Sequence, residues 1–247
     1  MDKDSVKIAV LSDFHYSLEP NTACPERRGE YLPAILAAMV KKLNCEVKPD
    51  LVLIGGDLIN FPDAPEAERL TAIIAEILSL LDMPYTVIRG NHDLEQEKFV
   101  KFFPFKKVTD IKFVRIVAFD DAETPGYNAV RSEADLKAMA EFADWDGIKL
   151  SFQHTPLLPQ GKCIYNYDNA EEIFEVMLKN NYCGAISGHY HEGIKLFSAD
   201  KLQFFVQNAL CESPFGATLL EISREGIISA DEIIPPCRGM HATVVRR

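Results

Sequence analysis

The stretch VKIAVLSDFH, residues 6–15, decides how the rest of the chain is interpreted. Its first six residues are mostly β-branched or apolar, which is typical of a strand buried on both faces. The run then ends abruptly in Asp13 and His15. The same texture, an apolar run closed by polar residues, returns in four further segments: DLVLIGGD (50–57), YTVIRGNHD (85–93), IKLSFQHT (148–155) and CGAISGHYH (183–191).

Segments with helical periodicity lie between several of these runs, at 30–43, 66–81, 133–143 and 169–180, and a further strand-like run spans 113–121. This alternation predicts an α/β fold built from strand–helix units. After residue 193 the pattern changes to a hairpin turning near Ala199 and Asp200, followed by short strands at 217–223 and 227–233. We therefore expect a single domain over residues 1–247, with antiparallel strands in its last quarter and a loosely held tail at 235–247.

The composition is that of a soluble globular protein, with 47% hydrophobic and 26% charged residues in 247. No apolar run approaches the roughly 18 residues of a membrane span, and the polar start MDKDSVK does not read as a signal peptide. A cytoplasmic protein without a membrane partner is the expectation. The net charge of −11 disfavours nucleic-acid binding, but it permits a small phosphate-ester substrate, because bound divalent ions reverse the sign of a local site.

The polar residues that close the strands are expected to converge, because ligand sites of α/β sheets lie outside the carboxyl ends of the strands. Each has an ordinary explanation when taken alone: Asp13 and Asp57 as helix caps, Gly-Asn-His-Asp as a turn, and His154 as a partly buried histidine. Histidine is not a residue that turns favour, however, and five of the six histidines fall in this set. The combined pattern therefore favours a metal site over capping and turns, with these candidate ligands: Asp13, His15, Asp57, Asn91, His154, His189 and His191.

Imidazole, carboxylate and amide donors suit borderline first-row ions such as Mn, Fe, Zn or Co. Seven candidates exceed the needs of one ion that keeps an open position. They suit two divalent ions about 3.5–4 Å apart with one shared carboxylate. In the stretch SGHYHEG (187–193), two histidines two residues apart can then serve one ion each, while Gly188 lets the backbone come close.

Taken in order, Asp-x-His, Gly-Asp, Gly-Asn-His-Asp, a lone His and Gly-His-x-His resemble the motifs of the calcineurin-like metallophosphoesterases. The resemblance spans residues 13–191 and implies two packed mixed β-sheets flanked by helices, a four-layer αββα sandwich. It implies that Asp57 bridges two ions. The resemblance implies that the first ion is bound by Asp13, His15 and His191, and the second by Asn91, His154 and His189. It also implies that His92 lies over the scissile phosphate and that Asp93 orients His92.

The implied activity is a phosphohydrolase that uses a metal-activated hydroxide, with a phosphodiesterase acting on cyclic nucleotides or other small diesters preferred. Two alternatives stay open: a phosphomonoesterase or nucleotide phosphatase with the same site, and a metal-stabilised interaction scaffold without turnover. Arg27 and Arg28, in the loop after the first motif, are candidates for substrate binding, with a solvated loop as the ordinary alternative.

Overall fold

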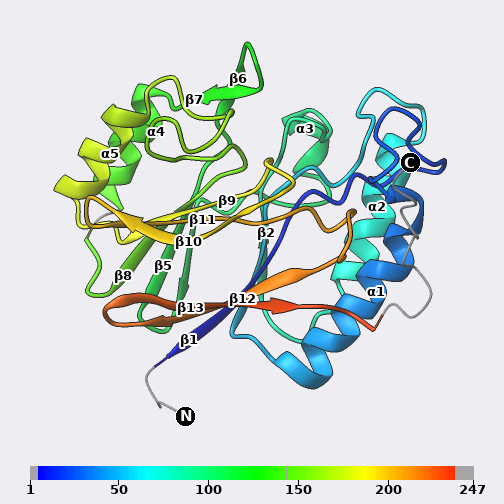
Figure 1. Cartoon of the computed structure of the whole chain (residues 1–247), viewed down its shortest axis with the longest axis horizontal. Coiled ribbons are helices and arrows are strands. Elements are labelled where there is room, and N and C mark those ends of the chain that lie inside the picture. Colours follow the sequence, from blue (N-terminus) through cyan, green and yellow to red (C-terminus); the bar gives the residue numbers. More distant parts are fainter. Residues whose placement is uncertain (1–4, 143, 237–247) are drawn as a thin grey trace.

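The strand β1 (Val6–Leu11) shows why the chain folds in layers. Successive side chains of a strand point to opposite faces. Ile8 and Val10 join an apolar core between two sheets, whereas Ala9 and Leu11 join a separate core beneath helices. In the computed structural model, which describes residues 5–142 and 144–236, two sheets lie face to face with helices on both outer sides (Figure 1).

One sheet has five strands, and β1 lies at its centre. β1 pairs in parallel with β2 and antiparallel with β12. In spatial order the strands are β13 (Gly226–Ile233), β12 (Ala217–Ser223), β1, β2 (Leu51–Ile54) and β3 (Tyr85–Val87).

The other sheet has six strands and is also mixed. Its middle strands, β11, β9, β8 and β5, run parallel, and an antiparallel strand flanks them at each edge. In spatial order the strands are β10 (Ile194–Ala199), β11 (Leu202–Val206), β9 (Gly184–Ser187), β8 (Ile148–Phe152), β5 (Val114–Ala118) and β4 (Val108–Ile111).

Helices cover the outer face of each sheet (Figure 1). α1 (Leu32–Lys42) and α2 (Ala67–Leu78) pack on the five-stranded sheet, and α4 (Glu133–Glu141) and α5 (Ala170–Lys179) pack on the six-stranded one. Shorter elements are a 3-10 turn (Gly29–Tyr31), a π-helical end to α1 (Leu43–Val47) and α3 (Gln96–Phe99). The four-layer αββα architecture expected from the sequence is confirmed.

The elements that the sequence pattern did not reveal are short. Besides α3, they are the edge strand β4 and a two-stranded hairpin of β6 (Ala122–Thr124) and β7 (Asn128–Val130). The last quarter does supply antiparallel pairs, but it is divided: β10 and β11 extend one sheet, and β12 and β13 complete the other. The turn predicted near Ala199 and Asp200 joins β10 to β11. Of the predicted tail, all but 235 and 236 lies outside the described residues.

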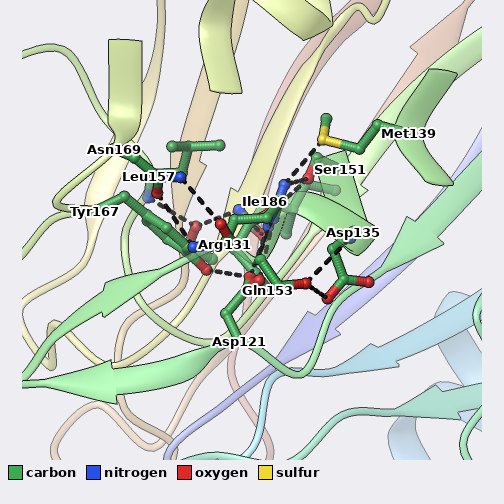
Figure 2. Close-up of polar contacts among 12 residues, drawn as sticks. Asp121, Arg131, Asp135, Met139, Ser151, Gln153, Leu157, Tyr167, Asn169 and Ile186 are labelled. Carbon is green, nitrogen blue, oxygen red and sulfur yellow. Dashed lines mark hydrogen bonds and ion pairs between the residues drawn. The ribbon is translucent and has the colours of Figure 1, made fainter. Parts of the chain in front are cut away.

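A buried ion pair fastens the hairpin β6–β7 to the six-stranded sheet (Figure 2). The Arg131 side chain is 0% exposed and that of its partner Asp121 is 3% exposed, with Nη2 and Oδ2 2.7 Å apart. The guanidinium also donates to Ser151 Oγ at 3.2 Å and to Gln153 Oε1 at 3.3 Å, and it lies over the Phe119 ring. Because Gln153 directly precedes His154, the pair connects the hairpin to the end of β8.

Removing one member of this pair is expected to cost much stability. Asp121→Ala leaves the Arg131 charge buried without a counter-charge, which typically costs about 3–5 kcal/mol. The control is Glu141→Ala, because Glu141 forms an exposed pair with Lys137 at 3.8 Å, and such pairs contribute about 0–1 kcal/mol. Urea unfolding of the two variants measures the difference. Equal losses of unfolding free energy in both would contradict the assignment.

Candidate metal centre

The polar residues that close the strands meet at one edge of the two stacked sheets. The five-stranded sheet supplies three groups of them and the six-stranded sheet supplies two, so the site spans the boundary between the sheets. Asp13 and His15 follow β1, Asp57 follows β2, Asn91 and His92 follow β3, His154 follows β8, and His189 and His191 follow β9.

Asp13, His15 and His191 form one cluster of ligand atoms. The Nε2 atoms of His15 and His191 are 3.0 Å apart, and His191 Nε2 lies 3.5 Å from Asp13 Oδ1. Asp13 is fully buried, and its Oδ1 accepts no hydrogen bond from any described residue. Asp13 Oδ1 therefore lies near the Nε2 atom of His191 without accepting a hydrogen bond from the described part of the chain.

His154, His189 and Asp57 form a second cluster, and Asn91 borders it. His154 Nε2 lies 3.2 Å from His189 Nδ1 and 3.2 Å from Asn91 Oδ1. Asp57 faces both clusters: its Oδ1 lies 3.4 Å from His154 Nε2, and its Oδ2 lies 3.4 Å from His15 Nε2. One carboxylate thus stands between two groups of ligands.

Hydrogen bonds fix the tautomers of two of these histidines. His154 Nδ1 lies 2.6 Å from the carbonyl oxygen of Gly55, and His191 Nδ1 lies 2.5 Å from Glu212 Oε1. A carbonyl and an ionised carboxylate only accept, so both Nδ1 atoms carry hydrogen. When the rings are neutral, each Nε2 then presents a lone pair toward the acceptor oxygens of Asp13, Asp57 and Asn91. Acceptors facing acceptors in a buried site need a cation between them.

The protonation equilibria show the same demand for positive charge. Burial lowers the pKa of His154, but the charge of Asp57 and a hydrogen bond to it raise the pKa to about 10. Burial likewise opposes the charged form of His191, whose contacts with Asp13 and Glu212 raise its pKa to about 9. Both imidazole Nε2 positions therefore lie where the surrounding carboxylates stabilise a cation.

The backbone at the site is held in uncommon conformations. Asp13, His15, Asp57 and His189 all have positive φ, between 43° and 66°, a region that non-glycine residues rarely adopt. Such conformations gather at functional sites. Gly188 permits the close approach, because a Cβ there would lie 2.0 Å from Ser12 Oγ and 2.9 Å from Asp13 Oδ2.

His92 borders both clusters, but Asp93 does not contact its ring. The Nδ1 atom of His92 lies 2.9 Å from the carbonyl oxygen of Asn60, and the rings of His92 and His15 are 4.8 Å apart. The carboxylate of Asp93 instead accepts hydrogen bonds from the backbone N–H groups of Leu58 and Gly90. Burial and the nearby charge of Asp57 raise the pKa of Asp93 to about 7. The hydrogen bond of the His92 ring is therefore with Asn60, and Asp93 ties the turn after β3 to the end of β2.

The two arginines of the loop after β1 differ in their surroundings. Arg28 is held by Glu30, with Nε 2.9 Å from Oε1, and its guanidinium lies over the Tyr31 ring. Arg27 is half-buried, and its positive charge lies close enough to His15 to help lower the pKa of that histidine, after the larger effect of burial. Of the two, Arg27 has the better placed charge for an anion at the site.

Glu212 is a site residue that sequence reasoning did not single out. It lies in the segment between β11 and β12, whose backbone donates from Leu210 to Ser12 and from Cys211 to Asp13. These bonds hold the segment against the end of β1, which places Glu212 beside His191. In the sequence, Glu212 is an acidic residue in a segment without strand or helix periodicity. Such a pattern does not predict which residue the carboxylate contacts.

Comparisons with known proteins identify the family of the chain. The family described as calcineurin-like phosphoesterase matches residues 6–193. The chain belongs to this family. Its members are metallophosphoesterases with a dinuclear divalent metal centre, and the residue clusters described above could bind such ions. No curated protein sequence gives a significant match to the chain.

Solved structures share the fold at low sequence identity. A dimetal phosphatase from Danio rerio superposes with a TM-score of 0.71 at 14% identity, covering 94% of this chain and 100% of that one. GAP50, described as the anchor in the inner membrane complex of Plasmodium, gives 0.57 at 12% identity over 94% and 90% of the two chains. The purple acid phosphatase PPD1 of yellow lupin gives 0.55 at 14% identity over 90% and 50%. These likenesses establish the fold alone.

None of the helices in residues 5–142 and 144–236 has the length and apolar character needed to cross a membrane.

The contact between Glu212 and His191 predicts an effect on metal affinity. Partners that hydrogen-bond a metal-ligating histidine typically contribute 10–100-fold to affinity. Glu212→Gln is therefore expected to weaken binding of one ion by about tenfold or more, as measured by titration of Mn²⁺ or Zn²⁺ against a chromophoric chelator. Glu232→Gln is the control, because Glu232 borders the same hollow as Glu212 but contacts no histidine of the site. Unchanged affinity in Glu212→Gln would remove the positioning role.

Proposed function

We propose that the chain is a binuclear metal-dependent phosphodiesterase that cleaves small diesters, cyclic nucleotides included. The observation that carries the proposal is the pair of Nδ1 hydrogen bonds to Gly55 and Glu212, which leaves the Nε2 atoms of His154 and His191 facing buried carboxylate oxygens, each with a lone pair when its ring is neutral. That donor set of nitrogen and oxygen atoms suits Mn, Fe, Zn or Co. The proposal rests on these contacts together with the family membership.

The ligand assignment follows the two clusters. Asp13, His15 and His191 would hold one ion, Asn91, His154 and His189 the other, and Asp57 would bridge them. When bound, two such ions lower the pKa of a coordinated water and offset the charge of the phosphoryl oxygens. The negative charges of Asp13 and Asp57 would offset the repulsion between two bound cations, and the second carboxylate oxygen of Asp13 accepts the backbone N–H of His189 at 3.0 Å.

His92 is the proposed proton donor to the leaving oxygen. Its Nδ1–H is engaged by the carbonyl of Asn60, which fixes the ring and leaves Nε2 as the atom that exchanges a proton. The backbone N–H of His92 donates to Asp57 Oδ1 at 2.8 Å. The backbone of His92 is therefore tied to the carboxylate that faces both metal clusters, and the Asn60 contact orients the ring, which supports a fixed position of the ring beside a bound phosphate.

The charges around the site favour a monoanionic diester over a dianionic monoester. A hollow of about 900 Å³ beside His191 is bordered by Glu192, Glu212 and Glu232 against one cation, Lys195, among its lining residues. A smaller hollow of about 240 Å³ beside Asn91 has three acidic residues at its border, and there Arg89 is paired with Asp120. Arg27 is the proposed residue that contacts a non-bridging phosphate oxygen.

Two other functions are compatible with the same residues. A phosphomonoesterase would use the same ligands, and two of the structural neighbours are described as phosphatases. A scaffold without turnover is the other, since one neighbour of this fold is described as an anchor. Substrate comparison separates all three.

A matched pair of substrates tests the proposed specificity. With the Mn-loaded protein, kcat/KM is expected to be higher for bis-p-nitrophenyl phosphate than for p-nitrophenyl phosphate at one pH, and elemental analysis should give close to two ions per chain. A preference for the monoester of about tenfold, which equals about 1.4 kcal/mol in transition-state stabilisation, would establish the phosphatase instead. Two bound ions without hydrolysis of either ester would establish the scaffold.

Loss of the His92 side chain is expected to separate proton donation from metal binding. His92→Ala should retain both ions, with kcat lower by about 10²–10⁴-fold, the usual contribution of a general acid. The loss should be smaller for a p-nitrophenyl diester than for an alkyl diester, because p-nitrophenolate leaves without much protonation. Kinetics on both esters, with metal content measured alongside, provide the test. An equal decrease of kcat for both esters would indicate that His92 stabilises charge instead of donating a proton. Loss of a bound ion would indicate that His92 is a metal ligand.

A further inference from the structure

Three tyrosines from separate segments gather around His189. Tyr127 lies in the turn between β6 and β7, Tyr165 in the segment between β8 and α5, and Tyr190 beside His189 itself. The Tyr165 ring lies at their centre, with its centroid 4.6 Å from His189, 6.3 Å from Tyr127 and 6.3 Å from Tyr190. All three contacts are edge-to-face. None of these tyrosines is among the proposed metal ligands, and none is the proposed proton donor.

The outermost ring is held in solvent at a conformational cost. Tyr127 is 56% exposed, and it has a φ of 62° directly after Gly126, whose φ is 87°. A bulky residue with positive φ is an outlier that a turn does not need, since glycine or asparagine would serve there. An exposed aromatic ring in a strained turn beside a functional site indicates a role outside the fold.

Hydrogen bonds join the two segments that carry Tyr127 and Tyr165. Ala129 of β7 accepts from Asp168 at 2.8 Å and donates to Asn166 at 3.1 Å, and Asn166 donates to Asn128 Oδ1 at 2.9 Å. These bonds tie the hairpin to the segment that carries Tyr165. The hairpin projects beyond the six-stranded sheet (Figure 1), and Arg131 anchors its base. The two tyrosines therefore lie on joined segments, and their rings contact one another to form a wall in the protein without ligand.

We propose that Tyr127 and Tyr165 form a stacking subsite for the planar aromatic part, a nucleobase or an aryl group, of a phosphoester held at the metal centre. The inference rests on the proposed function, because the phosphoryl group must lie at the ligand clusters for its substituent to reach this wall. Tyr165 contacts His189 directly, so the wall begins where the second cluster ends. Tyrosine faces bind planar rings without needing a particular hydrogen-bonding pattern.

Binding of two ligands that differ only in the base tests the subsite. Adenosine 5′-monophosphate and ribose 5-phosphate share the phosphoryl group and the sugar, and calorimetry on the metal-loaded protein measures both without turnover. Stacking of one base typically changes affinity by about tenfold or more. The nucleotide should therefore bind about tenfold tighter. Tyr127→Ala and Tyr165→Ala should reduce that ratio toward one, and Tyr127→Phe and Tyr165→Phe should retain it.

Ile228→Ala is the matched control, because Ile228 on β13 is also 56% exposed and lies on a strand that contributes no ligand. In the Ile228→Ala variant, the ratio of the affinities for the two ligands should equal that of the unaltered protein. Equal affinity of the unaltered protein for the two ligands would overturn the stacking subsite and leave the phosphodiesterase standing. A ratio that survives both alanine substitutions would also overturn it, and would show that the tyrosines only shield His189. Failure of both ligands to bind the metal-loaded protein would overturn the subsite, whereas the phosphodiesterase would still be decided by hydrolysis of bis-p-nitrophenyl phosphate.

Discussion

Asp57 lies fully buried between two groups of histidines, with one carboxylate oxygen 3.4 Å from His15 and the other 3.4 Å from His154. An ionised carboxylate in such a place is tolerated only when positive charge surrounds it. The charge of Asp57 accordingly raises the pKa of His154, and the pKa of Asp57 itself is held well below its usual value by His154 and His15 despite burial. Most of the site is arranged around this one requirement.

The contacts around the site orient the histidine rings so that their Nε2 atoms face the carboxylates. Carbonyl and carboxylate acceptors take the Nδ1 hydrogens of His154 and His191, so the opposite nitrogens stay available. Left-handed backbone conformations at Asp13 and His189 turn the chain sharply after each strand. The left-handed conformations cost free energy in the protein without ligand, and together with the hydrogen bonds they preorganise a site for a cation. Preorganisation of this kind is expected of a centre that stabilises charge during a reaction.

The sequence was sufficient for the parts of the structure that follow a periodic pattern. Apolar runs predicted the central strands, and parallel strands of one sheet bring their ends together, so the convergence of Asp13 and Asp57 was predictable. His154 follows β8 of the other sheet, and its approach to them depends on the packing of two sheets that the family resemblance implied. Glu212 was not, because it reaches His191 through non-periodic backbone bonded to Ser12 and Asp13. The orienting role of Asp93 toward His92 was implied by the family resemblance, whereas the carboxylate of Asp93 accepts hydrogen bonds from the backbone N–H groups of Leu58 and Gly90. The hairpin of Tyr127 has strands too short for alternation to be visible.

The ligand clusters draw on both sheets, and this has a consequence for the stability of the whole protein. Over most of their area the sheets adhere through apolar side chains such as Ile8 and Phe152, but at the edge where the strands end their contact is polar. An ion held there by residues of both sheets would act as a crosslink between them. Since the unfolded chain cannot assemble such a site, the free energy of unfolding would rise with the logarithm of free metal concentration. The lifetime of the folded protein would then be set in part by the metal supply of its surroundings.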